Sequence, residues 1–274
     1  MRLMTKLNIL DKKYNFLRPI KTDNLIRLGI NADGGYVVDS KTIENCNFLI
    51  SFGLGSHWSF ELDCLKKNKN LLIFVYDHTV SKWPYLLEIW KYLRRLLTFR
   101  ATIEALQTRI EGYIKFRKFI NLDNVELYNE RIIYPKRESK DIDLKKVFSR
   151  INNKSEVILK SDIEGDEYKI IDQLIEYSSR IKMLMIEFHW INKNENIFLD
   201  SVKKLKNFFE IIHIHGNNHD LKLKNGLPIT LELTFLNKNL VLNQKVEYID
   251  DFPIKYLDYP NNPNQEDLNF SFRD

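Results

Sequence analysis

The most constraining feature of this chain is the alternation of short apolar runs with longer segments of helical pattern. Residues 47–52 (NFLISF) form the first run and residues 71–76 (LLIFVY) form the second. Between them lie a glycine turn, residues 53–55, and a predicted helix, residues 57–68, that Ser56 is placed to cap. Uniformly apolar runs of this length are typical of strands buried on both faces of a parallel sheet. This part of the chain therefore predicts one βαβ unit.

The same alternation continues and determines the fold class. Further strands are predicted at residues 125–129, 157–161 and 183–188, and further helices at residues 141–149, 166–177 and 195–208. Two last strands, 211–215 and 229–236, are joined by a polar loop too short for a helical crossover, so we expect an antiparallel pair. The pattern predicts a doubly wound, mostly parallel, Rossmann-like α/β sheet with an antiparallel final strand.

The length of 274 residues suits one large domain with additions. We expect this domain to cover residues 1–274. Its additions are an N-terminal cap (1–45) with the turn Asp33-Gly34-Gly35-Tyr36, a helical insertion (81–122) and an irregular tail (250–274), rich in Asn, Asp and Pro, that we expect at the surface.

The insertion interrupts the alternation and carries most of the positive charge. Its residues 82–118 hold nine basic side chains against three acidic ones. A basic amphipathic helix with Trp and Tyr is suited to a membrane surface, a glycolipid or another anionic partner. The simpler interpretation, which we favour, is a solvated helix pair that packs on the sheet or on a second subunit in a homo-oligomer.

Composition narrows the remaining classes. The net charge of +5 is too small to imply a nucleic-acid partner. The first 17 residues mix Lys and Asp with isolated apolar residues, unlike a signal peptide, and no stretch approaches the apolar length of a membrane span. Cys46 and Cys64 stand in no disulfide framework or metal-binding spacing. We therefore expect a soluble protein of a reducing compartment, the cytoplasm.

The glycine turn is the first candidate binding site. In a doubly wound sheet, ligands bind beyond the carboxyl ends of the strands where the strand order reverses, and the first βα turn lies there. Gly53 and Gly55 let the backbone approach a ligand, and Asp77 stands at the tip of the second strand, where its carboxylate is placed to accept both hydroxyls of a ribose. Trp58 stands where a dinucleotide fingerprint needs a third glycine, which disfavours pyrophosphate.

The motifs of this chain resemble those of the FkbM-type methyltransferase family. The likeness is an ordered series of motifs: Asp33-Gly34-Gly35-Tyr36, Ser51-Phe52-Gly53-Leu54-Gly55 with Ser59-Phe60-Glu61, Asp77, and residues 159–167 (LKSDIEGDE). It covers residues 27–235 except the insertion, and it departs from the usual pattern at Ser161. The resemblance implies a class I fold, S-adenosylmethionine as the cofactor, and methylation of a hydroxyl on a sugar, polysaccharide, glycolipid precursor or related small molecule.

The resemblance also implies which residues surround the cofactor. It places residues near the methionine end, the ribose, the adenine and the transferred methyl group of the cofactor. These residues are Asp33, Gly34, Gly53, Leu54, Gly55, Glu61, Asp77, Asn129, Glu130, Asp162 and Glu164. The residues themselves support Asp162, which ends the fourth strand, next to the first strand, where a carboxylate would border the sulfonium charge.

Methyl transfer to a hydroxyl needs an aligned acceptor and a group that takes its proton. His189 is our first candidate for this base and His215 the second, because imidazole titrates near neutral pH. Asp162 and Glu187 complete the predicted catalytic set. The same four side chains could instead bind a divalent metal that orients a diol, which we do not favour because their spacing is not contiguous. Trp190 and Trp58 each have two possible roles, either stacking on a sugar ring or packing in the core.

Three rival functions use the same features. A nicotinamide-dependent oxidoreductase would need the missing third glycine, and a non-catalytic nucleotide-binding or scaffold protein is disfavoured because Gly53, Gly55, Asp77, Asp162 and Glu164 occur together. A nucleic-acid methyltransferase is supported by the basic insertion alone. The chain lacks the Asn-Pro-Pro-Tyr type of motif found in enzymes that methylate amino groups, so O-methylation is the better hypothesis.

Overall fold

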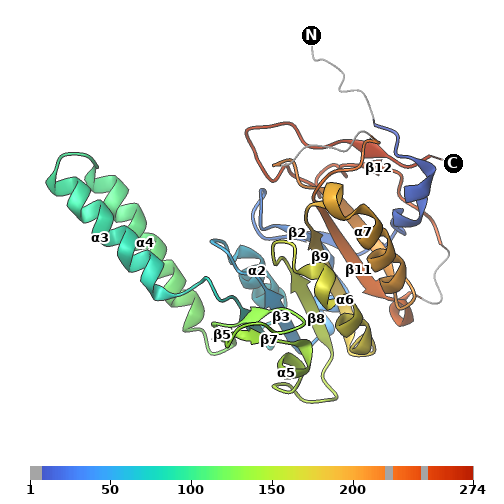
Figure 1. Ribbon diagram of the computed structural model, residues 1–274, viewed down its shortest axis with the longest axis horizontal. Helices are drawn as coiled ribbons and strands as arrows, with labels where there is room; N and C mark the ends of the chain where they lie inside the picture. The colour runs from blue at the N-terminus through green and yellow to red at the C-terminus, as the bar shows by residue number, and fades with distance from the viewer. Residues whose placement is uncertain (1–7, 220–224, 242–245, 274) are drawn as a thin grey trace, which may run out of the picture.

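A computed structural model describes residues 8–219, 225–241 and 246–273 (Figure 1). Its core is a seven-stranded sheet in the order β10-β11-β9-β8-β3-β4-β5. In chain order these strands are β3 (Phe48–Phe52), β4 (Leu72–Tyr76), β5 (Val125–Tyr128), β8 (Val157–Ser161), β9 (Ile181–Phe188), β10 (Phe209–Gly216) and β11 (Leu231–Asn237). Strands β5, β4, β3, β8 and β9 run parallel, and β11 is antiparallel to both of its neighbours.

The strand order confirms the predicted fold class. The chain leaves the central strand β3 toward β4 and β5 on one side, and returns to β8 and β9 on the other side. The order therefore reverses between β3 and β8, and their carboxyl ends define the crevice where such sheets bind ligands. This is a doubly wound, Rossmann-like sheet with an antiparallel final strand and a helical insertion.

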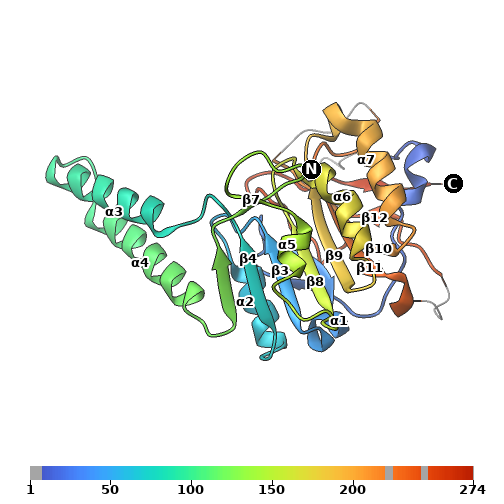
Figure 2. The same ribbon diagram turned by 60° about the horizontal axis from the view of Figure 1, so that its bottom comes forward.

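Helices cover both faces of the sheet (Figure 2). The helices of the described residues, including two that extend away from the sheet, are η1 (Lys12–Leu17), α1 (Ser40–Asn45), α2 (Ser59–Lys67), α3 (Lys82–Leu97), α4 (Ile103–Ile120), α5 (Leu144–Phe148), α6 (Glu167–Glu176), α7 (Ile191–Leu205) and η2 (Lys238–Leu240). Because side chains alternate along a strand, each face has its own core. Ile50 and Leu159 pack in the core that also contains residues of α5, α6 and α7, whereas Leu49 and Ile158 pack in the core with residues of α1 and α2.

Shorter strands complete the fold. Strands β1 (Leu25–Leu28) and β2 (Tyr36–Asp39) form the hairpin predicted around the Asp33-Gly34-Gly35-Tyr36 turn, and β6 (Arg131–Ile132) pairs with β7 (Asp141–Ile142). Near the C-terminus β12 (Asp251–Phe252) pairs with β13 (Phe270–Ser271). Among the described residues, no helix has both the length and the apolar character needed to cross a bilayer.

Three predicted helix starts are displaced. The helix after the glycine turn begins at Ser59, and Ser56 does not cap it because its N-cap residue is Trp58. The helix expected from residue 141 is shorter, because Asp141 belongs to β7 and the side chain of Asp143 caps α5 by accepting from the Lys146 N–H. The helix after β9 begins at Ile191, four residues before the predicted start.

The tail is irregular but not a surface chain throughout. Its Asp258 side chain is fully buried and its Asn261 is 3% exposed. Asp258 lies 3.0 Å from His213, and Asp267 lies 3.1 Å from His215, both on β10. These pairs hold the tail against the end of the sheet, and the sequence contained no sign of them.

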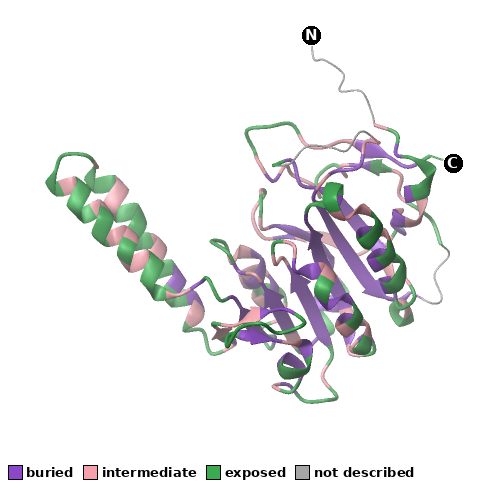
Figure 3. Cartoon of the chain, viewed as in Figure 1, coloured by how far each residue is buried: buried purple, intermediate pink, exposed green. Residues whose placement is uncertain are grey.

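The insertion is a helical hairpin. Helices α3 and α4 lie side by side and extend away from the sheet, largely without buried residues (Figures 1–3). Its attachment is at the end of α4, where Trp58 stacks on Phe119 with 5.6 Å between ring centres and meets Phe116 edge-on at 5.8 Å. Trp58 is therefore a packing residue at the base of the hairpin and not a platform for a sugar.

Candidate functional site

The strand register brings the predicted site residues into one row. Phe52 pairs with Tyr76 of β4 and with Ser161 of β8, so Gly53, Asp77 and Asp162 each follow directly at the same edge of the sheet. Backbone hydrogen bonds continue one step past these strands, from the Gly53 N–H to Tyr76 O at 3.0 Å and from the Asp162 N–H to Phe52 O at 3.0 Å. The hydrogen-bonded ladder therefore includes Gly53 and Asp162 themselves.

A cavity of about 570 Å³ opens above this row. Its lining is Gly53, Gly55, Tyr76, Asp77, His78, Thr79, Glu130, Arg131, Ile132, Asp162, Ile163, Glu164, Asp166 and Trp190. Six of the predicted cofactor residues are in this set. The lining contains five carboxylates but one arginine, so the charge of the cavity suits a cationic ligand better than a pyrophosphate.

The two glycines of the turn have different roles. Gly53 has φ +76°, and a Cβ there would lie 1.8 Å from the Asp162 carbonyl oxygen, so the close approach of β3 and β8 requires glycine. Gly55 has φ +60°, but among the described atoms none lies within 4 Å of where its Cβ would be. Gly55 thus leaves open space at the wall of the cavity, where a ligand can approach the backbone.

A buried ion pair supports the turn from below. The Lys160 ammonium donates to the Gly53 carbonyl at 2.8 Å and lies 3.7 Å from the Glu61 carboxylate, which accepts from the Ser51 hydroxyl at 2.7 Å. Glu61 is fully buried and lies outside the residues that line the cavity. Glu61 therefore lies beneath the turn together with Lys160, a residue that the sequence analysis did not single out.

Asp77 stands where it was predicted, but its carboxylate is already occupied. One oxygen accepts from the N–H groups of Leu54 at 2.9 Å and Gly55 at 3.2 Å, and the other accepts from Thr79 and Val80. Burial works to raise the pKa of Asp77, but the hydrogen bonds from Thr79, Gly55 and Leu54 outweigh it and lower the pKa. Asp77 therefore braces the glycine turn, an arrangement that leaves it less free for a ribose than the sequence suggested.

The two residues predicted near the adenine differ. The Asn129 amide donates to the carbonyls of His78 and Val80 at 3.3 and 3.1 Å, so it fixes the turn after β4 and lies outside the cavity lining. Glu130 does line the cavity, and both of its oxygens accept from Arg150, at 2.5 and 2.9 Å. Leu54 contributes its backbone N–H to Asp77 and not a side chain to the cavity.

A cluster of acids surrounds His189 at the end of β9. Its Nε2 lies 3.8 Å from Asp162, 3.9 Å from Glu187 and 3.6 Å from Glu164, whereas its Nδ1 faces Glu167 at 3.4 Å. Glu167 is fully buried and accepts from the N–H groups of His189 and Gly165, each at 2.7 Å. Glu167 thus orients the imidazole and turns Nε2 toward the carboxylates.

This environment changes the predicted role of His189. Burial alone would lower its pKa, but the contact with Glu167 and the negative charges of Glu187 and Asp162 raise the pKa to about 10. An imidazole that is already protonated at neutral pH does not accept a proton from a hydroxyl. Burial, together with the charges of Glu164 and Asp33, raises the pKa of Asp162. Burial, together with the charges of Asp162 and Glu232, raises the pKa of Glu187. These carboxylates are therefore stronger bases than ordinary ones.

His215 does not join His189. Its ring contacts Glu232 at 3.4 Å and Asp267 at 3.1 Å, and it is buried. These two acids raise the pKa of His215 well above its ordinary value although burial opposes them, so it serves as the cation of a buried ion pair. The set of four predicted metal ligands is therefore not assembled. The other three predicted ligands do lie together: the ligand atoms of Asp162, Glu187 and His189 are within 4.8 Å of one another.

A second group of acids, which the sequence suggested only in part, adjoins the first. Asp33, Glu187 and Glu232 also place carboxylate oxygens within 4.8 Å of one another. Asp33 is exposed and receives a hydrogen bond from Asn261 at 3.4 Å, and Asn261 also donates to Glu232 at 2.6 Å. Asn217 donates to Glu187 at 2.8 Å. Glu232 is an acidic residue within the mostly apolar strand β11, and this position was the one sequence signal that could have marked it as a site residue.

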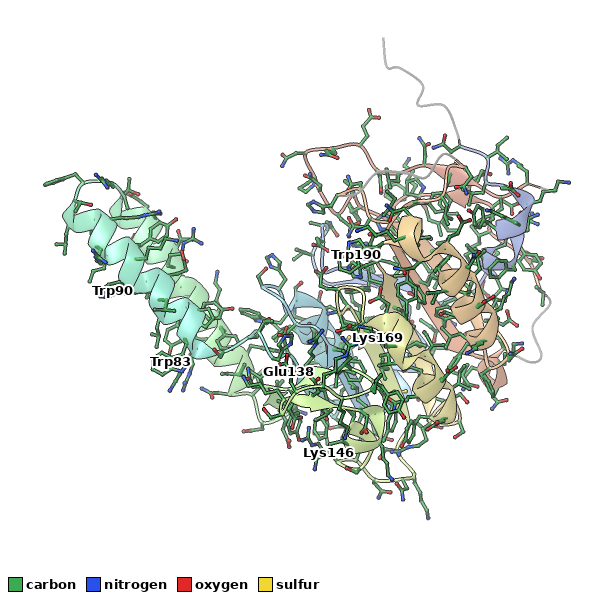
Figure 4. All side chains as sticks on the ribbon, in the orientation of Figure 1. Trp83, Trp90, Glu138, Lys146, Lys169 and Trp190 are labelled. Carbon is green, nitrogen blue, oxygen red and sulfur yellow. The ribbon has the colours of Figure 1, made fainter. Side chains whose placement is uncertain are left out.

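The remaining predicted residues border the cluster. Gly34 lies in the β1–β2 turn, where a Cβ would meet His57 at 3.5 Å, and Tyr36 of the same turn donates its hydroxyl proton to Asp162 at 3.3 Å. The Glu164 side chain is 80% exposed at the rim. Trp190, at the carboxyl end of β9, lines the cavity and is 44% exposed, which leaves its ring available for stacking (Figure 4).

Comparison with known proteins gives similarity in structure alone. No family model matches the chain. No curated protein matches it in sequence. Among solved structures, a fibrillarin pre-rRNA processing protein of Methanococcus jannaschii is 9% identical, with a TM-score of 0.38 over 72% of this chain and 68% of that one. A precorrin-6y C5,15-methyltransferase of Geobacter metallireducens is 12% identical, with a TM-score of 0.36 over 73% and 86%. The fold described above rests on the strand order and register of this chain itself.

Proposed function

We propose that this protein is an S-adenosylmethionine-dependent methyltransferase. The observation that carries the proposal is the turn from Gly53 to Gly55, which opens toward an acidic cavity at the reversal of the strand order. A sulfonium cofactor is cationic at the reacting atom, and carboxylates such as Asp162 and Glu164 would stabilise that charge. The antiparallel last strands of the sheet and the motifs that resemble the FkbM-type family support the same conclusion.

A hydroxyl is the acceptor that fits the cluster at β9. In an in-line displacement, the acceptor oxygen forms its bond to the methyl carbon as the bond from that carbon to sulfur breaks, and S-adenosylhomocysteine leaves. The hydroxyl proton must go to a base, and we assign this role to Asp162, whose side chain is 26% exposed and borders the cavity. His189, held as a cation, then positions the Asp162 and Glu187 carboxylates. A sugar, polysaccharide or glycolipid precursor is the acceptor class that the family resemblance favours, with Trp190 placed to stack on a ring.

Metal-assisted O-methylation is a second candidate, favoured by one observation. His189 points its Nε2 at the Asp162 and Glu187 carboxylates and has the Glu167 carboxylate beside its Nδ1. A carboxylate in that position commonly accepts the other ring N–H of a metal-bound imidazole and so orients the ring. Carboxylate and imidazole ligands suit Mn²⁺ or Zn²⁺, and a bound cation would hold two neighbouring hydroxyls of an acceptor and lower the pKa of one. Titration with Mn²⁺, monitored by electron paramagnetic resonance, tests this candidate. Saturable binding lost in His189→Gln would support it, and unaltered free Mn²⁺ would exclude it.

Calorimetric titration with S-adenosylhomocysteine tests the methyltransferase proposal. We expect micromolar binding, which weakens in Gly55→Ala because the added methyl group projects into the cavity. Gly112→Ala is the matched control, since Gly112 on α4 also has no described atom within 4 Å of its Cβ position. Lack of binding by the wild-type protein, with and without divalent metal, would refute the proposal and favour a non-catalytic scaffold.

The assigned base is tested by transfer of a labelled methyl group to a panel of sugar hydroxyls. Asp162→Asn is expected to retain S-adenosylhomocysteine binding and to lose about 10²- to 10⁴-fold in kcat, the range for removal of a general base. Asp172→Asn, on the exposed side of α6, is the matched carboxylate control. Full activity of Asp162→Asn would exclude Asp162 as the base.

A further inference from the structure

We propose that the α3–α4 hairpin docks on an anionic lipid surface through one face of α3. This docking face consists of Trp83, Leu87, Trp90 and Leu97 together with Phe99 at the tip of the hairpin. The first four residues are spaced by four, three and seven positions, so they form one stripe along the helix. Trp83 and Trp90 both lie along α3 (Figure 4).

The docking face is unusually exposed for its chemistry. Trp83 and Leu87 are each 63% exposed, Trp90 is 56%, Leu97 is 75% and Phe99 is 98%. Every residue of α3 is described, and none is buried. A contiguous apolar surface of this kind costs free energy in water and commonly marks an interaction site.

The opposite face of α3 already has a partner. Tyr85 stacks on Phe116 of α4 with 4.7 Å between ring centres, and Tyr92 accepts a hydrogen bond from Arg109 of α4 at 3.1 Å. The hairpin therefore closes on itself through one face of α3. The docking face points away from that contact and is not needed for the pairing of the two helices.

Charge identifies the occupant of the docking face. Residues 82–118 contain nine basic and three acidic side chains, an excess of +6, while the net charge of the whole chain is +5. All other residues together thus carry a charge of −1, and the positive charge is concentrated on the hairpin. Arg94 lies over the Trp90 ring at 4.7 Å and Lys82 over the Trp83 ring at 5.4 Å, so cations flank the apolar stripe.

An anionic bilayer satisfies both features of this face. Trp rings and Leu side chains enter the boundary between headgroups and acyl chains, while Arg and Lys meet the lipid phosphates. A second copy of the chain would bring two surfaces of charge +6 together, which is unfavourable. A nucleic-acid backbone would neutralise the cations but would leave Leu87, Leu97 and Phe99 in water. The lipid surface is therefore the occupant that the observations favour.

Docking would also orient the cavity. A smaller cavity of about 310 Å³ is lined by Pro84 and Tyr85 at the base of the hairpin and by Gly55 and Thr79, which also line the cofactor cavity. If the proposed methyltransferase function holds, a hairpin on the membrane presents the active site to lipid-linked acceptors. The docking itself does not depend on that function, because it needs neither cofactor nor acceptor.

Vesicle co-sedimentation tests the proposal with the full chain. We expect binding to vesicles of phosphatidylcholine with roughly one third phosphatidylglycerol, weak binding to phosphatidylcholine alone, and weakening by salt. The combined substitution Trp83→Ser, Trp90→Ser and Leu97→Ser should weaken binding by at least about tenfold, since it removes most of the apolar contact. Arg94→Glu changes the charge by two units and should weaken binding by about thirtyfold, the equivalent of about 1 kcal/mol per unit charge.

The control substitutes exposed apolar residues elsewhere. Ile197, Leu240 and Tyr256 are 53, 44 and 77% exposed, and their combined change to Ser should leave vesicle binding intact. Retained binding of S-adenosylhomocysteine or an unchanged circular dichroism spectrum establishes that each variant is folded. Failure of the wild-type protein to bind anionic vesicles, or equal binding by the docking-face variant, would overturn the proposal. So would a dimer in vesicle-free solution that the docking-face variant dissociates, because a second copy would then cover the face.

Discussion

The two glycines of the binding turn allow a sharp test of how the turn is built. Both have left-handed φ angles, and a side chain at either position would lower the free energy of unfolding by about 1–2 kcal/mol because of that conformation. Only Gly53 also lies against a neighbouring strand, because its Cβ would be 1.8 Å from the Asp162 carbonyl oxygen. Relief of that overlap requires β3 and β8 to separate where Asp162 N–H donates to Phe52 O.

The two substitutions should therefore differ in kind. Forced insertion into a packed region costs about 1–3 kcal/mol more, so Gly53→Ala should lower the free energy of unfolding by roughly 2–5 kcal/mol. A loss of 1 kcal/mol lowers the Tm of a chain of 150–250 residues by roughly 2–4 °C, so the Tm of Gly53→Ala should fall by about 4–20 °C. Gly55→Ala should lower the free energy of unfolding by only about 1–2 kcal/mol. Its methyl group enters the cavity, however, so the main effect of this substitution should be weaker binding of S-adenosylhomocysteine.

Urea denaturation and calorimetric titration on the same preparations separate the two effects. Gly112→Ala, in a helix interior, is expected to be neutral or slightly stabilising because alanine favours helix. Equal losses of stability in Gly53→Ala and Gly55→Ala would refute the claim that β3 and β8 meet at Gly53. Unchanged ligand affinity in Gly55→Ala would refute the claim that Gly55 faces the ligand.

Three further predictions concern the charges around the turn and the cluster. Because the pKa of His189 is raised to about 10, its contribution to stability should be complete below pH 6.5 and lost as the pH rises through 10. In a chelating buffer, the difference in unfolding free energy between wild type and His189→Asn should shrink over that range, and a constant difference would contradict it. Asp77→Asn should destabilise the protein by about 1–3 kcal/mol near neutral pH, with the difference vanishing in acid, since the pKa of Asp77 is lowered. Lys160→Met should cost about 3–5 kcal/mol by leaving Glu61 uncompensated, and adding Glu61→Gln should recover part of that loss in a double-mutant cycle.

The sheet was predictable because its strands are buried on both faces. Runs such as LLIFVY are then uniformly apolar, and the glycine turn and helical segments between them leave few other topologies. Helix starts were less predictable, because they depend on local capping. Ser56 has the right side chain for a cap, yet α2 starts at Ser59.

The site was predictable where it depends on strand ends. Gly53, Asp77, Asp162 and His189 each follow a strand of the parallel sheet, so their meeting at one edge follows from topology. Their electrostatic state was not predictable, because it depends on contacts between distant segments. Glu167 comes from the start of α6, and together with Glu187 and Asp162 it converts the expected base His189 into a cation.

The error on His215 has the same origin. The tail that contains Asp267 has no periodic pattern, so nothing in the sequence suggested that it returns to β10 and pairs with this histidine. Asp77 shows the converse case. Its position was predictable from the strand end, but the hydrogen bonds that occupy its carboxylate arise from the folded turn.

The most direct test of the central claim is an experimental structure of the protein with S-adenosylhomocysteine bound. We expect the ligand in the cavity above β3, β4 and β8, with its backbone contacts at Gly53 to Gly55 and its sulfur toward Asp162. Such a structure would also show whether Asp77 releases the glycine turn to hold the ribose. S-adenosylhomocysteine bound elsewhere, or an empty cavity at saturating ligand, would contradict the assignment of this cavity as the cofactor site.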